Sequence, residues 1–197
     1  MMNRIRKICR RPDRRGLTLI ELMISLSVFG IVMAVVFSFL TGARNSYQST
    51  REKVQYQQSV RAVISLITRE VRSTGCDPTS AGFEPFGMAD TANLQCHMDL
   101  NGDGDTTDTG PDESITYGYN AGTGELVRFD GAVSMTILRD LNNLTFTYFD
   151  VDGAVLGAVP LNAVDRSLVR YVEVMFDGET EHGEPVSYTT RIALRNG

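Results

Sequence analysis

The sequence predicts an α+β protein in which one long N-terminal helix packs on an antiparallel β-sheet. Residues 17–72 contain no proline and only two glycines, and they are rich in helix-forming side chains. The chain beyond residue 113 instead contains short runs rich in Val, Ile, Thr, Tyr and Phe, separated by turn residues. Because these runs follow the helix and do not alternate with other helices, the pattern indicates segregated α and β regions.

Residues 17–40 have the length and composition of a membrane-spanning helix. They include one charged side chain, that of Glu21, and at 1.5 Å per residue they extend about 36 Å, enough to cross a hydrocarbon core. A secretory signal peptide is the alternative interpretation. Its apolar core would be shorter and would end in small residues at a cleavage site, and no A-x-A pattern ends this run.

Charge is distributed very unevenly along the chain. Residues 1–16 form a basic leader with seven Lys or Arg side chains and one acid, whereas the remainder has 12 basic and 23 acidic residues. The positive-inside rule favours a cytoplasmic leader, which places the chain after Leu40 on the far side of the inner membrane. The acidic remainder argues against a nucleic-acid partner and suits a solvated or cation-binding surface.

Residues 41–74 predict an amphipathic continuation of the same helix. One apolar stripe, which we expect to pack on the sheet, consists of Val60, Val63, Ile64, Ile67 and Val71. Gly75 and Pro78 end the helix, and residues 75–197 are expected to form a β-rich globular domain.

Six segments of this domain have strand composition. They are residues 114–119, 125–129, 132–138, 144–151, 168–177 and 187–194. Asp130-Gly131 lies between two of them and is a hairpin signal. We expect these strands to form one antiparallel sheet.

The segment "RRGLTLIELMISL", residues 14–26, resembles the class III signal of type IV pilins and type II secretion pseudopilins. The shared pattern is a basic leader, a glycine and an apolar helix with Glu at its fifth position, which Glu21 occupies when Leu17 is counted as the first mature residue. The resemblance implies cleavage between Gly16 and Leu17 by prepilin peptidase, methylation of the new amine, and a pilin-like fold. The stretch "REVRSTGCD", residues 69–77, is most similar to the minor pilin group called PilW, with a J-like pseudopilin as the alternative.

Two positions depart from the family pattern. Leu17 stands where the family usually has phenylalanine, and Ser38 stands where many major pilins have a helix-kinking proline. Other apolar residues occur at the first position, so Leu17 changes little. Ser38, together with the large acidic domain, favours a minor subunit over an abundant major one.

Glu21 is a charge inside a membrane segment, which is costly unless something pairs with it. Cleavage after Gly16 would create an α-amine on Leu17. In a filament the Glu21 carboxylate could then neutralise the amine of a neighbouring subunit within the apolar core. Gly16, without a side chain, would let the peptidase approach the backbone closely. The alternative is an incidental acid in a plain membrane anchor, which explains neither Gly16 nor the basic leader.

Cys9 lies in the leader, which leaves Cys76 and Cys96 as a pair beyond the membrane. An oxidising compartment favours a disulfide between them. Two free thiols are the alternative. A metal site is less favoured, because His97 is the only histidine nearby and there is no C-x-x-C pair.

Residues 99–113, "DLNGDGDTTDTGPDE", begin with the spacing of a calcium-binding loop. The candidate ligands are Asp99, Asn101, Asp103, Asp105 through its carbonyl, and Thr107 or Asp108. Gly110 replaces the bidentate Glu of the twelfth position, which leaves Asp112 or Glu113 to close the site. A solvated acidic turn is the alternative. The possible cofactor is therefore structural Ca²⁺.

These features together predict a structural subunit and not an enzyme, since the sequence contains no recognisable Ser-His-Asp set, phosphate loop or closed metal site. The resemblance implies other pilins, prepilin peptidase, an inner-membrane assembly platform and, before assembly, membrane lipid as partners. The predicted location is the inner membrane first and a periplasmic or cell-surface filament afterwards. The alternative from another class is a calcium-dependent binding module that stays in the membrane.

Overall fold

The structure is a computed structural model that describes residues 16, 18–108, 110, 112–180 and 183–195. The predicted leader, apart from Gly16, and Leu17 therefore lie outside the described residues. The chain divides into two compact units, one ending at Gln48 and the other beginning at Ser49.

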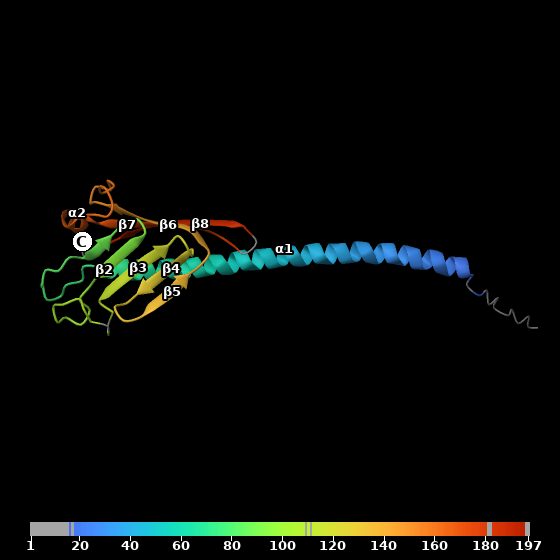
Figure 1. The fold of residues 1–197 in the computed structure, drawn as a ribbon, viewed down its shortest axis with the longest axis horizontal. Coiled ribbons are helices and arrows are strands. Elements are labelled where there is room, and N and C mark those ends of the chain that lie inside the picture. The colour runs from blue at the N-terminus through green and yellow to red at the C-terminus, as the bar shows by residue number, and fades with distance from the viewer. Residues whose placement is uncertain (1–15, 17, 109, 111, 181–182, 196–197) are drawn as a thin grey trace, which may run out of the picture. The chain divides into compact units, whose positions relative to one another are not determined.

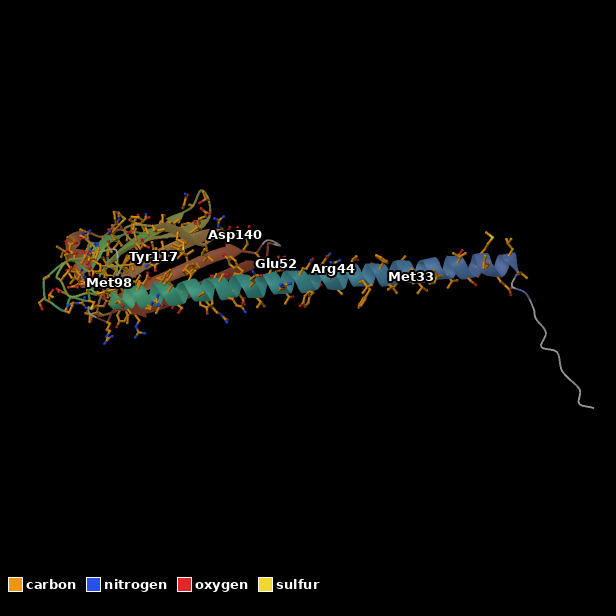
Figure 2. The ribbon with its side chains drawn as sticks, turned by 90° about the horizontal axis from the view of Figure 1, so that it is seen from below. Met33, Arg44, Glu52, Met98, Tyr117 and Asp140 are labelled. Carbon is orange, nitrogen blue, oxygen red and sulfur yellow. The ribbon has the colours of Figure 1, made fainter. Side chains whose placement is uncertain are left out.

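Helix α1, Leu19–Ser73, begins in the first unit and ends in the second. It continues through Gly30 and Gly42 without interruption. Every described residue from Gly16 to Gln48 is exposed, including large apolar side chains such as Leu19 and Phe39, which are 78% and 74% exposed. Figure 2 shows these side chains, Met33 among them, projecting from the ribbon. By length and composition α1 could cross a membrane.

The second unit contains the rest of α1 and two antiparallel sheets, as Figure 1 shows. The first sheet has the order β1-β2-β3-β4-β5, with strands Phe86–Ala89, Asn93–His97, Ser114–Asn120, Glu125–Phe129 and Ser134–Leu138. The second has the order β6-β7-β8, with strands Leu141–Phe149, Tyr171–Glu179 and Pro185–Ala193. The α+β, pilin-like fold class is confirmed, but the strands form two sheets and not the single sheet that the sequence predicts.

One hydrophobic core joins α1 to both sheets. Val60, Val63, Ile67 and Val71 of the predicted stripe are buried, and Ile64 packs beside them partly exposed. Strand β7 alternates buried and half-buried positions along its length, as a strand with one core face should. The largest buried side chains of the sheets are aromatic; they are Tyr117, Tyr148, Phe86, Phe146 and Phe176.

Three elements are missing from the sequence prediction. Strands β1 and β2 are short and contain Gly, Asn and Gln, so their composition gives no strand signal. Helix α2, Ala163–Leu168, overlaps the predicted strand 168–177 only at Leu168, and the Asn162 side chain caps it by accepting a hydrogen bond from the Asp165 amide. The predicted hairpin at Asp130 is confirmed, with a four-residue connection between β4 and β5.

A buried ion pair links α1 to the five-stranded sheet. Glu70 on α1 is 7% exposed, and both of its carboxylate oxygens lie 3.2 Å from Nε of Arg128 on β4. The Tyr117 hydroxyl on β3 donates to Glu70 Oε2. Burial, followed by the negative charge of Glu70, raises the pKa of Tyr117 well above its usual range, so the hydroxyl keeps its proton. Figure 2 places Tyr117 within this unit.

We expect Arg128→Met to lower the free energy of unfolding by about 3 kcal/mol or more, because it leaves the Glu70 carboxylate buried without its cation. Arg139→Met is the matched control, since Arg139 is 69% exposed and pairs with Glu125 at 3.3 Å. That variant should stay within about 0.5 kcal/mol of the wild type. Denaturant unfolding of the full chain in detergent measures both values. Equal losses in the two variants would contradict a special role for the buried pair.

Candidate functional site

The predicted processing site lies at the start of the described chain. Gly16 is exposed, and no atom of the described residues lies within 4 Å of a Cβ placed on it. The fold therefore makes no steric demand for glycine at this position. A requirement for glycine has to come from something outside the folded chain, such as an enzyme that approaches this peptide bond. Leu17, the other half of the site, lies outside the described residues.

Glu21 is held by a reciprocal set of hydrogen bonds at the beginning of α1. Its Oε2 accepts from the Thr18 amide at 2.9 Å and from the Thr18 hydroxyl at 2.8 Å. The Glu21 amide in turn donates to the Thr18 hydroxyl at 3.3 Å. This arrangement is a capping box, which satisfies backbone donors that a helix N-terminus otherwise leaves free. The T-x-x-E spacing of Thr18 and Glu21 is the sequence signal of this capping box.

These observations define a class of protein. An exposed apolar half-helix begins at Leu19, carries an acid at the fifth residue after Gly16, and leads into an α+β domain. This is the arrangement of a protein with a class III prepilin signal.

Comparison with known protein families agrees with this class. Residues 11–37 match the family described as the prokaryotic N-terminal methylation motif. The match supports a relation to the type IV pilins and pseudopilins, a family of structural proteins. It also supports membrane anchoring of the N-terminal helix before assembly, processing by prepilin peptidase and assembly with other pilins. No curated protein matches the chain.

The acidic segment between β2 and β3 is organised around Asp99, which is fully buried. Asp99 Oδ1 accepts from the Gly102 amide at 2.5 Å, and Oδ2 accepts from the Gly104 amide at 3.0 Å. The Thr79 hydroxyl also donates to Oδ2. Through both oxygens Asp99 braces the turn, and its role as the first ligand stays a prediction.

The other predicted ligands lie on the outside of this turn. The Asn101 amide nitrogen donates to Asp103 Oδ2 at 3.0 Å and to Asp108 Oδ2 at 2.6 Å. Partial desolvation, followed by the charges of Asp103, Asp105 and Glu113, raises the pKa of Asp108. The structure therefore brings most of the predicted acidic residues together, and they repel one another.

Of the two residues that could close the site, only Glu113 points toward it. Asp112 Oδ2 lies 2.9 Å from Arg128 Nη2, so this carboxylate is paired with Arg128. Glu113 is fully buried, and its carboxylate oxygens, with those of Asp103 and Asp105, include one set of three atoms within 4.8 Å of one another. Asp103, Asp105 and Glu113 are thus the carboxylates placed to share one cation.

Cys76 and Cys96 are both free thiols in the structure, and the disulfide that the sequence predicts stays a prediction. Cys96 lies on the core face of β2, buried and in hydrogen-bond contact with the Thr74 side chain, whereas Cys76 is only half-buried. The backbones of the two segments are joined instead by hydrogen bonds from the Gly75 amide to the His97 carbonyl and from the Asp99 amide to the Cys76 carbonyl. Burial raises the pKa of the Cys96 thiol to about 12.

We expect Cys76 of the native protein to react with a maleimide at about pH 8, and Cys96 to react only after unfolding. With a pKa of about 12, the Cys96 thiolate fraction at that pH is on the order of one in ten thousand, and the thiolate is the reactive form. Mass mapping of the labelled peptides separates the two residues from Cys9. A linked Cys76–Cys96 peptide in a non-reducing digest would instead support the bond that the sequence predicts.

Proposed function

We propose that the protein is a minor subunit of a type IV pilus or a related filament. It would be processed between Gly16 and Leu17 by prepilin peptidase and assembled through its N-terminal helix. The single observation that carries this proposal is the exposed apolar half of α1, which begins at Leu19 and contains one acid, Glu21. Such a surface needs either lipid or other apolar helices around it.

The helix would serve in both surroundings in turn. Before assembly it spans the inner membrane, with the basic leader in the cytoplasm and the β-rich domain on the far side. After cleavage it leaves the lipid and packs against other pilin helices in the core of the filament. The Glu21 carboxylate then pairs with the Leu17 amine of a neighbouring subunit, and the acidic domain faces outward to contact other minor pilins.

The similarity of residues 69–77 to the PilW group makes a PilW-like minor pilin the first assignment, with a J-like pseudopilin of a type II secretion system as the second. Two further features favour a minor position. Ser38 keeps the helix free of a proline kink, and α1 has no break there. The large acidic domain is also less suited to an abundant shaft subunit. Co-purification of the protein with its neighbouring subunits distinguishes the pilus from the secretion system.

A second candidate function is a calcium-dependent binding module that stays anchored in the inner membrane. The cluster of Asp103, Asp105 and Glu113 favours it. The two functions differ in where the mature protein is found. Detection of the protein in sheared surface filaments supports the filament subunit, whereas retention of the whole mature pool in the inner membrane supports the anchored module.

We expect the mature protein to begin at Leu17 with a methylated amine. N-terminal sequencing and intact mass of the membrane-extracted protein measure both features. Gly16→Leu should leave an unprocessed precursor, because a bulky side chain would obstruct access to the peptide bond. Gly30→Leu, a glycine within the same helix and with equally open surroundings, is the control and should be processed normally. A native start at Met1 or inside the apolar run would rule out the class III signal.

Glu21 variants can separate charge pairing from helix capping. Glu21→Gln keeps a side chain that can complete a capping box but removes the charge, whereas Thr18→Val removes the hydroxyl of the box and keeps the charge. We expect both variants to be inserted and cleaved. Quantitative blotting of sheared filaments should show loss of the Glu21→Gln protein and incorporation of the Thr18→Val protein. The opposite order would mean that Glu21 acts through the cap and would refute the intersubunit ion pair.

A further inference from the structure

We propose that Asp103, Asp105 and the buried Glu113 bind one Ca²⁺ ion in the segment that connects β2 to β3. In this arrangement Glu113 closes the site in place of the missing twelfth-position acid, and Asp99 holds the turn in shape through the Gly102 and Gly104 amides. The site is independent of the helix and of the processing signal.

The buried carboxylate of Glu113 is the main evidence for the site. Its side chain is fully buried, and Oε1 accepts from the Leu100 amide at 2.8 Å and from the Asn101 amide at 3.1 Å. Oε2 is buried too, and among the described residues no donor forms a hydrogen bond with it. A buried carboxylate oxygen without a partner costs free energy that a bound cation would recover.

Oε2, the oxygen without a partner, belongs to the same Glu113 carboxylate that forms a cluster with Asp103 and Asp105. Carboxylate oxygens of Asp103, Asp105 and Glu113 approach within 4.8 Å of one another, a separation that one ion can bridge at a bond length of about 2.4 Å. Asp103 and Asp105 are exposed, so an ion held there could complete its coordination with water. A site made only of oxygen ligands, on a loop and not on a rigid helix, suits Ca²⁺ better than Mg²⁺ or a transition metal.

The turn is already folded into a shape that holds these ligands. The Gly102 and Gly104 amides both point to Asp99, and both glycines have positive φ angles, 83° and 89°. Residues other than glycine rarely adopt this backbone conformation, so glycine is needed at both positions. Asp99 thus fixes the backbone on either side of Asp103, and Glu113 Oε1 fixes residues 100 and 101.

The neutral Asn101 side chain lies between two carboxylates of the segment. Its amide group donates to both Asp103 and Asp108, so the two carboxylates already converge on a shared donor. A cation would replace this weak neutral donor with a full charge. The alternative interpretation of a solvated acidic turn explains the exposed residues but not the buried, half-satisfied Glu113.

The test is calorimetric titration of the full-length protein in detergent with CaCl₂, together with melting curves at several Ca²⁺ concentrations. We expect one site with a dissociation constant of about 1 mM or tighter, and a melting temperature that rises with Ca²⁺. Glu113→Gln should weaken binding by about tenfold or more, because Gln keeps an oxygen for the Leu100 amide but carries no charge. Asp103→Asn, an exposed change, should weaken binding as well and serves if the buried substitution impairs folding.

Asp152→Asn is the matched control, because Asp152 is an exposed acid in the separate Asp-Gly turn between β6 and α2. It should bind Ca²⁺ as the wild type does, and circular dichroism checks that each variant is folded. MgCl₂ should bind at least about tenfold more weakly than CaCl₂. Absence of binding heat and of a melting shift in the wild type would overturn the site, as would unchanged affinity in both folded ligand variants. Equal affinity for Mg²⁺ would overturn the assignment to calcium.

Discussion

The apolar half of α1 is the constraint on which the rest of this protein depends. Its side chains are exposed from Leu19 to Leu40, and within the described residues no other part of the chain buries them. A folded domain cannot leave such a surface in water, so lipid or apolar helices of other subunits must cover it. The C-terminal half of the same helix is different, because Val60, Ile67 and Val71 are buried in the chain's own core. One continuous element therefore anchors a stable domain at one end and offers an assembly surface at the other.

The position of Glu21 at the third residue of α1 eases the problem of an acid within this apolar surface. Near a helix N-terminus a carboxylate is favoured by the free backbone amides and by the helix dipole. Both Thr18 donors bond to one oxygen, Oε2, which leaves Oε1 available to a partner. Capping and intersubunit pairing are thus compatible in geometry, because each can use a different oxygen of the same group.

Much of the fold could be predicted from the sequence, because helix length and strand composition are local signals. The extent of α1 and the presence of strands β3 to β8 follow from such signals. The division into two sheets could not be predicted, since it depends on which strands pair, and that is set by long-range packing. The same limit applies to the acidic segment, where spacing alone could not show that the Asp99 oxygens accept from the Gly102 and Gly104 amides.

Among the described residues the domain contains two buried glutamates, and they differ in how their charge is compensated. Glu70 has a guanidinium at 3.1 Å and a tyrosine hydroxyl, so its charge is compensated within the fold. Glu113 has two backbone amides on one oxygen and, among the described residues, no ion pair and no hydrogen bond on the other. The pairing of Glu70 with Arg128 shows that a buried carboxylate needs a positively charged partner. By the same standard the proposed cation would compensate Glu113, and Asp103 and Asp105, whose oxygens lie in the same cluster, add further negative charge to the place where that cation would bind.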